Sequence, residues 1–198
     1  VSAQAVTLAE YTFDSGSAAA TNVASVVDMD DWDATTGTIS SDSAYINASE
    51  TLDNGGINPA TPTPYHAFSF TVQNLNPGEF LSVTNVSGYF FGSIHPGTGG
   101  SAGHRIQLYS DQVGYTDTGD RIGDEIWIDG NPDNSRPSST NFNISTSAIG
   151  ALGNGDTVEF RFYFSDGTGH SFAYTHRLDN ITLHGTVFVP RGTVVSIR

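Results

Sequence analysis

The chain has 198 residues, no cysteine and a net charge of −14, which comes from 21 acidic residues against seven basic ones. Without cysteine it has no disulfides and no thiolate metal sites. The acidic surface argues against nucleic acid and anionic lipid as partners, because both are polyanions, and no apolar run approaches the roughly 20 residues of a membrane span.

The first residues predict export. The chain begins V-S-A-Q-A, in which Ala3-Gln4-Ala5 fits the small-x-small end of a secretory signal. We therefore expect a secreted protein, extracellular or at the cell surface, with residues 1–5 as a signal-peptide remnant or an N-terminal extension. Val6–Phe13 follows as the first expected strand, because apolar residues alternate within it.

Residues 28–64 are expected to lie mostly in loops. Asp28–Asp33 reads D-M-D-D-W-D, and four carboxylates in six residues predict a solvated surface loop. Thr35–Pro64 is rich in Thr, Ser, Asn, Gly and Pro, with one short strand expected at Ala44–Ile46. Long irregular excursions of this kind often carry binding.

Two longer alternating segments follow, Tyr65–Gln73 and Phe80–Phe91, and we expect them to form a hairpin or adjacent strands. In the second segment the apolar residues change from odd to even positions. That change of phase predicts a bulge or bend near Thr84-Asn85.

The last third contains the clearest strand. Shorter strands are expected at Arg105–Tyr109, at Glu125–Ile128 and around Phe142–Ile144. Thr157–Ser165 then reads T-V-E-F-R-F-Y-F-S, with the two-residue period of a half-buried strand, and Arg177–Val189 has a similar pattern. We expect these last two segments to be neighbouring antiparallel strands with one face on the core.

Eight to ten strands with turn signals between them and little helix predict an all-β fold, an antiparallel β-sandwich of the jelly-roll kind. We expect residues 6–188 to form a single domain. Residues 189–198 are then a C-terminal extension, whose β-prone segment Thr193–Ile197 is able to pair as an extra strand with a neighbouring sheet edge.

Four segments carry a family likeness: Y-T-F-D at Tyr11–Asp14, H-A-F-S-F-T-V at His66–Val72, V-E-F-R-F-Y-F at Val158–Phe164 and L-D-N-I-T-L-H-G-T-V at Leu178–Val187. This pattern resembles exported β-sandwich proteins of environmental bacteria, often of the PEP-CTERM type. The chain departs from that type after Pro190, where Arg-Gly replaces Glu-Pro. The resemblance implies the sandwich fold. It also implies a likeness to jelly-roll carbohydrate-binding modules, which often hold a structural calcium ion near their paired terminal strands.

A calcium ion is the cofactor that the residues favour. If the first and last strands pair, Glu10 or Asp14 approaches Asp179 and Asn180, and carboxylate and amide oxygens are the ligands that Ca²⁺ takes. Asp179 shares the parity of the core-facing Ile181. It is therefore expected to turn away at a bulge, to cap a turn by hydrogen bonds, or to hold the ion.

Sugar binding needs exposed aromatic rings beside hydrogen-bonding groups. Trp127 qualifies, because Ile126 and Ile128 on either side of it face the other way, and Trp32 qualifies by its acidic surroundings. The alternative for Trp127 is packing under a loop or against the opposite sheet.

Nothing in the sequence supports catalysis. There is no G-x-S-x-G elbow, no HExxH and no thiol nucleophile, and the carboxylate pair Glu125 and Glu159 has no positive support as a glycosidase site. Two functions are therefore expected ahead of catalysis. The first is a non-catalytic extracellular module that binds polysaccharide, and the second is a structural subunit that binds copies of itself in a layer or filament by edge-strand or donor-strand pairing.

Overall fold

A computed structural model describes residues 6–34, 38–40, 43–48, 57, 59–60, 65–94, 104–128, 138–166 and 174–190. Within these ranges the chain forms eleven strands and two short 3₁₀ helices, and no described helix has the length and apolar character to cross a membrane. The strands are β1 Val6–Tyr11, β2 Val27–Met29, β3 Thr38–Ser40, β4 Ser43–Ala48, β5 Tyr65–Val72, β6 Phe80–Ile94, β7 His104–Ser110, β8 Ile122–Ile128, β9 Ser138–Ser145, β10 Thr157–Asp166 and β11 Tyr174–Phe188; the helices are Asp14–Gly16 and Thr118–Asp120.

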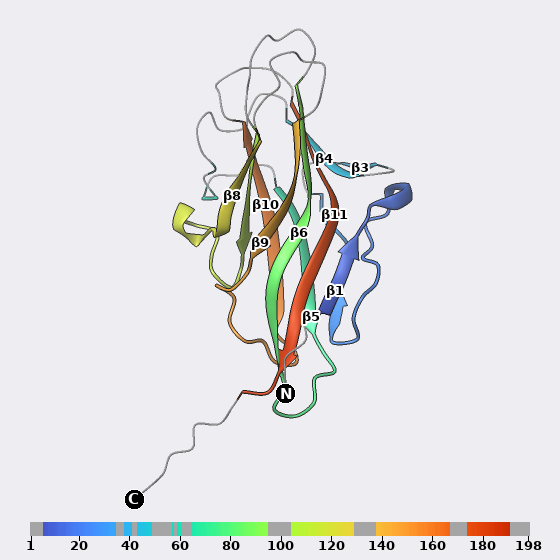
Figure 1. The fold of residues 1–198 in the computed structure, drawn as a ribbon, viewed down its shortest axis with the longest axis vertical. Helices are drawn as coiled ribbons and strands as arrows, with labels where there is room; N and C mark the ends of the chain where they lie inside the picture. The colour runs from blue at the N-terminus through green and yellow to red at the C-terminus, as the bar shows by residue number, and fades with distance from the viewer. Residues whose placement is uncertain are drawn as a thin grey trace, which may run out of the picture.

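The strands form two antiparallel sheets, which confirms the predicted sandwich. The front sheet, as Figure 1 views it, has the order β3-β4-β11-β6-β9, with β1 also paired to β11. The back sheet has the order β2-β5-β10-β7-β8. The short strands β2 and β3 are the two that the alternation of the sequence does not predict.

Strand β11 organises the front sheet. One of its edges pairs with β6 along nearly its whole length, and the other pairs first with β4, at Tyr174–Leu178, and then with β1, at Ile181–Gly185. A bulge at Asp179–Asn180 separates these two partners. Strand β1 therefore pairs with β11, which is the condition on which the expected calcium site depends.

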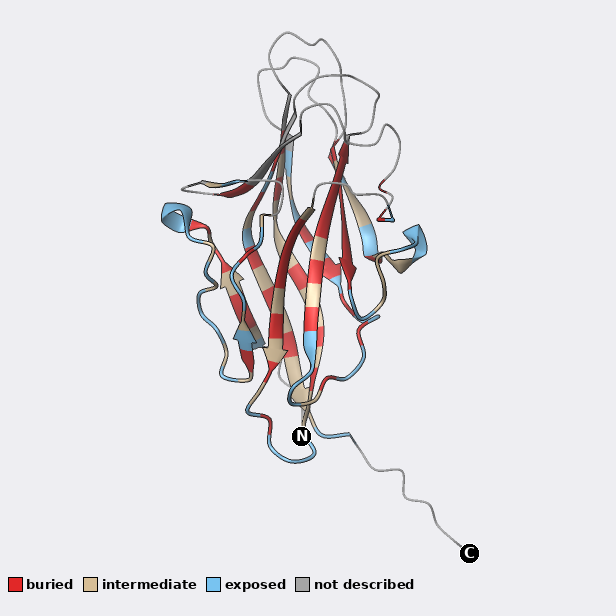
Figure 2. Ribbon diagram, turned by 180° about the vertical axis from the view of Figure 1, so that it is seen from behind, coloured by how far each residue is buried: buried red, intermediate tan, exposed pale blue. Residues whose placement is uncertain are grey.

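The core lies between the sheets, where buried positions recur along the strands (Figure 2). On β10 the four side chains in the predicted inward phase are fully buried: Val158, Phe160, Phe162 and Phe164. They meet buried side chains of β11, including Leu178, Ile181 and Leu183, in one continuous cluster. A buried aromatic ring contributes about 1.5–3 kcal/mol relative to an exposed one, so this layer carries much of the stability.

Two predicted strand pairings are wrong. Strands β10 and β11 lie in opposite sheets and face each other across the core, and β10 pairs with β5 and β7 instead. Strands β5 and β6 are likewise in different sheets. The physical reason is that alternation reports which face of a strand is buried, whereas two strands that share a core are equally well placed side by side or face to face.

The predicted change of phase in β6 is confirmed. His184 pairs with Asn85 and the next residue, Gly185, pairs with Val83, so Thr84 is the extra residue of a bulge. Buried positions accordingly move from Val83 to Val86. This bulge lets one strand of 15 residues keep apolar side chains on the core at both ends.

The outer faces of the two sheets differ. On the back sheet, Tyr109 and Tyr163 are buried beneath Ile57, and Tyr65 and Tyr115 pack against them. On the front sheet, the described residues form no second hydrophobic cluster. Its outer face therefore leaves the side chains of β6, β9 and β11 more accessible.

Candidate functional site

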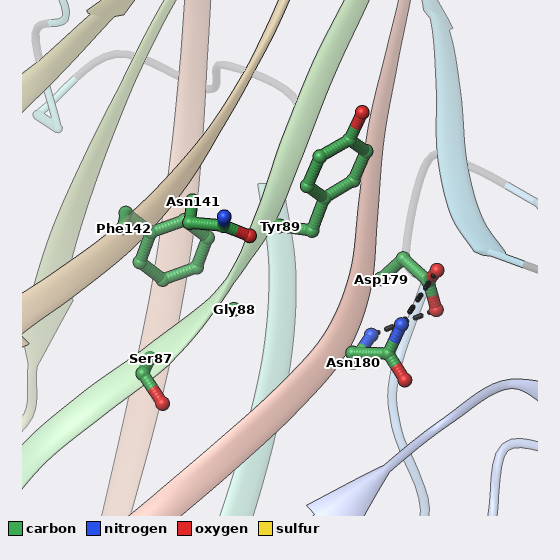
Figure 3. Close-up of a pocket in the computed structure, with 7 residues that line it drawn as sticks. All are labelled: Ser87, Gly88, Tyr89, Asn141, Phe142, Asp179 and Asn180. Atoms are coloured by element: carbon green, nitrogen blue, oxygen red, sulfur yellow. Dashed lines mark hydrogen bonds between the residues drawn. The ribbon is translucent and has the colours of Figure 1, made fainter.

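A shallow groove lies on the outer face of the front sheet. Its volume is about 520 Å³, and residues of three strands line it. Figure 3 shows these residues: Ser87, Gly88 and Tyr89 of β6, Asn141 and Phe142 of β9, and Asp179 and Asn180 of β11.

The register of the sheet sets the central row of the groove. Tyr89 pairs with Asn141 on one side and with Asp179 on the other. Figure 3 shows the Tyr89 ring between these two side chains. All three point outward, because Val86 and Phe90, in the other phase of β6, are buried. The sheet thus places a phenol, an amide and a carboxylate at one level.

The bulge of β11 fixes the acidic side of the groove. Asn180 has a left-handed backbone with φ of 51°, which Asn tolerates better than most residues. Its backbone N–H donates to Asp179 Oδ1 at 2.7 Å, and its side-chain Nδ2 donates to Asp179 Oδ2 at 2.9 Å. Of the outcomes expected for Asp179, the structure shows the turn away from the core at a bulge, together with local hydrogen bonds.

Polar side chains beside the groove pair with one another. Asn85 Nδ2 donates to Asn143 Oδ1 at 2.6 Å, and Ser87 Oγ lies 3.2 Å from His184 Nε2. The side chains of Tyr89 and Asn141 make no such bond within the part of the chain that the structure describes. Their hydrogen-bonding groups are therefore available to a ligand.

Trp32 does not lie at the surface, so its expected role as a sugar platform is wrong. Its side chain is 3% exposed and stacks on Phe68 at 5.4 Å, with Tyr11 and Phe13 edge-on at 5.2 and 5.1 Å. The neighbouring Asp31 is exposed. Exposed carboxylates on the neighbouring residues therefore do not show that the ring between them is exposed as well.

Trp127 faces outward, as its parity predicts. Its side chain is 41% exposed on β8, and the guanidinium of Arg105 lies 4.2 Å from the ring centroid. Its role in binding sugar stays a prediction, as does its alternative fate under a loop, because residues 129–137 lie outside the described residues.

The four residues expected to hold calcium lie along two paired strands and the turn after β1. Glu10 pairs in register with Thr182, and its carboxylate accepts a hydrogen bond from the side chain of Asn22. Asp14 begins the 3₁₀ helix that follows β1, while Asp179 and Asn180 form the bulge. Among the described residues, no three His, Cys, Asp or Glu side chains gather as metal ligands. Calcium stays a prediction, which melting with and without EDTA would test, because a bound ion raises the melting temperature.

Sequence reasoning missed the central groove residues, Ser87, Tyr89 and Asn141. The signal was present, since each lies in the polar phase of a strand whose other phase is apolar. What was absent was the pairing of β6 with both β9 and β11. The proposed donor segment, Thr193–Ile197, lies outside the described residues.

Comparison with solved structures gives distant neighbours. The chain is similar to a carbohydrate-binding module specific for non-crystalline cellulose, CBM28, with 14% identity, a TM-score of 0.38, and coverage of 73% of this chain and 75% of that one. It is also similar to the K1 cleaved adhesin domain of Lys-gingipain from Porphyromonas gingivalis W83, with 14% identity, a TM-score of 0.38, and coverage of 91% and 97%. The sequence matches no protein-family model and no curated protein. The resemblance to PEP-CTERM proteins accordingly stays a prediction.

Proposed function

We propose that the chain is a non-catalytic module that binds neutral polysaccharide in the groove of the front sheet. The observation that carries this proposal is the row formed by Asn141, Tyr89 and Asp179 on an outer face without a hydrophobic covering among the described residues. An extracellular location, which we propose together with this function, fits such a ligand, because wall and matrix polysaccharides lie outside the cell.

The chemistry of the row matches a sugar. The faces of a pyranose ring carry C–H groups that pack on an aromatic ring, and its hydroxyls need donors and acceptors around the edge. Tyr89 offers the ring and a hydroxyl, and Asn141 offers an amide that both donates and accepts. Asp179 is held in place by Asn180, so it is a fixed acceptor.

The charge of the site favours a neutral sugar. Asp179 is the charged residue among those that line the groove, and the whole chain carries a net charge of −14. An anionic polysaccharide, such as one built of uronic acids, is repelled by both. Neutral glucans, xylans and mannans carry no such penalty.

Affinity electrophoresis tests the proposal. Native protein is run in gels that contain hydroxyethyl cellulose, xylan, galactomannan or alginate. We expect retardation by at least one neutral polysaccharide and none by alginate. Tyr89→Ala removes the ring, and we expect it to weaken binding by about tenfold or more, which corresponds to about 1.4 kcal/mol.

A matched control separates lost contact from lost folding. Thr186→Ala changes another outward residue of β11 that does not line the groove, and it should be retarded like the native protein. Both variants should unfold at urea concentrations close to the native midpoint. Equal retardation of the native protein and Tyr89→Ala, or no retardation by any neutral polysaccharide, would exclude the groove as the site.

A further inference from the structure

Trp127 is an exposed aromatic ring on the side of the sandwich opposite the groove. It lies on β8 of the back sheet, where its side chain is 41% exposed, while Ile122 and Ile128 of the same strand are buried. The other tryptophan, Trp32, is 3% exposed. Tryptophan is usually largely buried, so a tryptophan that is 41% exposed calls for an explanation.

A chain of side-chain contacts holds this ring in place. The Arg105 guanidinium lies 4.2 Å from the ring centroid of Trp127, and its Nε lies 3.6 Å from Glu125 Oε1. Gln107 Nε2 donates to Glu125 Oε2 at 2.5 Å, and the buried Tyr109 hydroxyl donates to Gln107 Oε1 at 2.8 Å. The support therefore runs from a buried tyrosine to the surface, and a ring fixed in this way loses little entropy when it binds.

The polar groups of the same chain flank the ring at the surface. The side chains of Arg105 and Glu125 are 26% and 24% exposed, so each keeps part of its surface in solvent. The guanidinium lies over the ring, so a sugar stacks on the ring surface that Arg105 leaves exposed, while its hydroxyls bond to the exposed parts of the guanidinium and the carboxylate. An uncharged ligand is favoured, because Arg105 and Glu125 already neutralise each other.

We propose that Trp127 is a second sugar-stacking platform, which binds neutral polysaccharide separately from the groove and lets one molecule bridge two polysaccharide chains. The sheets of a sandwich lie about 10 Å apart, and the two sites face away from each other on opposite sheets. A straight segment of polysaccharide therefore does not contact both sites. The class of ligand is taken from the proposed function, on which this inference rests.

Tryptophan fluorescence tests the platform directly. The chain has two tryptophans and Trp32 is buried, so a sugar that stacks at the surface changes the emission of Trp127. We expect a saturable change when cellohexaose, xylohexaose or mannohexaose is added to the native protein. The change should persist in Tyr89→Ala and disappear in Trp127→Ala. If none of the three sugars changes the native emission, the platform is excluded.

The same variants separate the two sites. If sugar does not change the emission of the native protein, while the gels retard the native protein more than Tyr89→Ala, the platform is excluded and the groove is supported. Emission that responds equally in the native protein and in Tyr89→Ala, with retardation unaffected by Tyr89→Ala, excludes the groove and leaves Trp127 as the site.

Cross-linking tests the bridging. Native protein should raise the viscosity of a hydroxyethyl cellulose, xylan or galactomannan solution, because each molecule joins two chains. Tyr89→Ala and Trp127→Ala should each lose most of this effect while they still bind through the remaining site. A Trp127→Ala variant that raises viscosity as strongly as the native protein would overturn the proposal.

Discussion

Three buried histidines make the stability of the sandwich sensitive to acid. His104 of the back sheet and His176 of the front sheet meet across the core, with Nδ1 of the first 3.0 Å from Nε2 of the second. His66 lies nearby on β5, against Phe164. Burial lowers the pKa of His104 to about 4 and that of His66 to about 3. Burial, and then the neighbouring His104, lower the pKa of His176 well below its usual value.

The sign and size follow from proton linkage. Each imidazole has a pKa near 6.5 in the unfolded chain, so below that pH the unfolded state binds more protons than the folded state. The free energy of unfolding therefore falls as pH drops from about 6.5 towards the folded pKa. For each histidine whose folded pKa is about 3 or 4, the free energy of unfolding falls by about 2 kcal/mol between pH 7.5 and pH 5. His66 and His104 together account for about 4 kcal/mol, and His176 adds to that loss.

Urea denaturation at pH 7.5 and pH 5.0 measures this loss, with His66→Phe as the variant that removes one titrating group from the core. We expect the variant to lose about 2 kcal/mol less than the native protein between the two pH values, whatever its stability at pH 7.5. Phe70→Leu is the control, because it disturbs the same buried cluster without removing an imidazole. Its loss should equal that of the native protein. An equal loss in His66→Phe and the native protein would refute the reasoning.

Three further predictions concern packing and backbone. A Cβ on Gly92 would lie 2.3 Å from Cδ2 of His104, so Gly92→Ala should cost about 1–3 kcal/mol in urea melts, whereas Gly150→Ala, with no atom within 4 Å of the added Cβ, should cost much less. Trp32→Ala should cost about 3–5 kcal/mol, and a cost below 1 kcal/mol would mean that the ring is not in the core. Asn180 has a φ of 51°, so Asn180→Val should lower the free energy of unfolding by about 1–2 kcal/mol more than Asn180→Gly; equal urea midpoints for the two variants would argue against the left-handed conformation.

The alternation of residues predicts the layers of this fold but not its pairings. In β10 every second residue from Val158 to Phe164 is buried, as its sequence indicates. The same pattern gives no partner, because hydrogen bonds between strands involve backbone atoms that every sequence supplies. Strands β10 and β11 are joined by few residues, yet they lie in different sheets. Strand order follows from how the whole chain closes around its core.

The candidate sites show the same limit. The parity argument placed Trp127 outward correctly, because Trp127 lies within a regular strand. The parity argument does not apply to Trp32, because Trp32 follows β2 in an irregular segment. In such a segment the charged neighbours turn to solvent independently of the ring. Tyr89 and Asn141 are 52 residues apart in the chain, and only the pairing of β6 with β9 brings them together. A groove lined by three strands cannot be predicted from the sequence until the order of the strands in the sheet is known.

Amide NMR shifts of ¹⁵N-labelled protein, followed as cellohexaose, xylohexaose or mannohexaose is added, test most directly whether the front face binds sugar. We predict that at least one of these sugars shifts the amides of Ser87, Tyr89 and Asn141, together with the side-chain amide of Asn141. Resonances of the buried strand β5 should stay in place. Unchanged shifts at all three positions, with every one of these sugars, would contradict sugar binding at the groove.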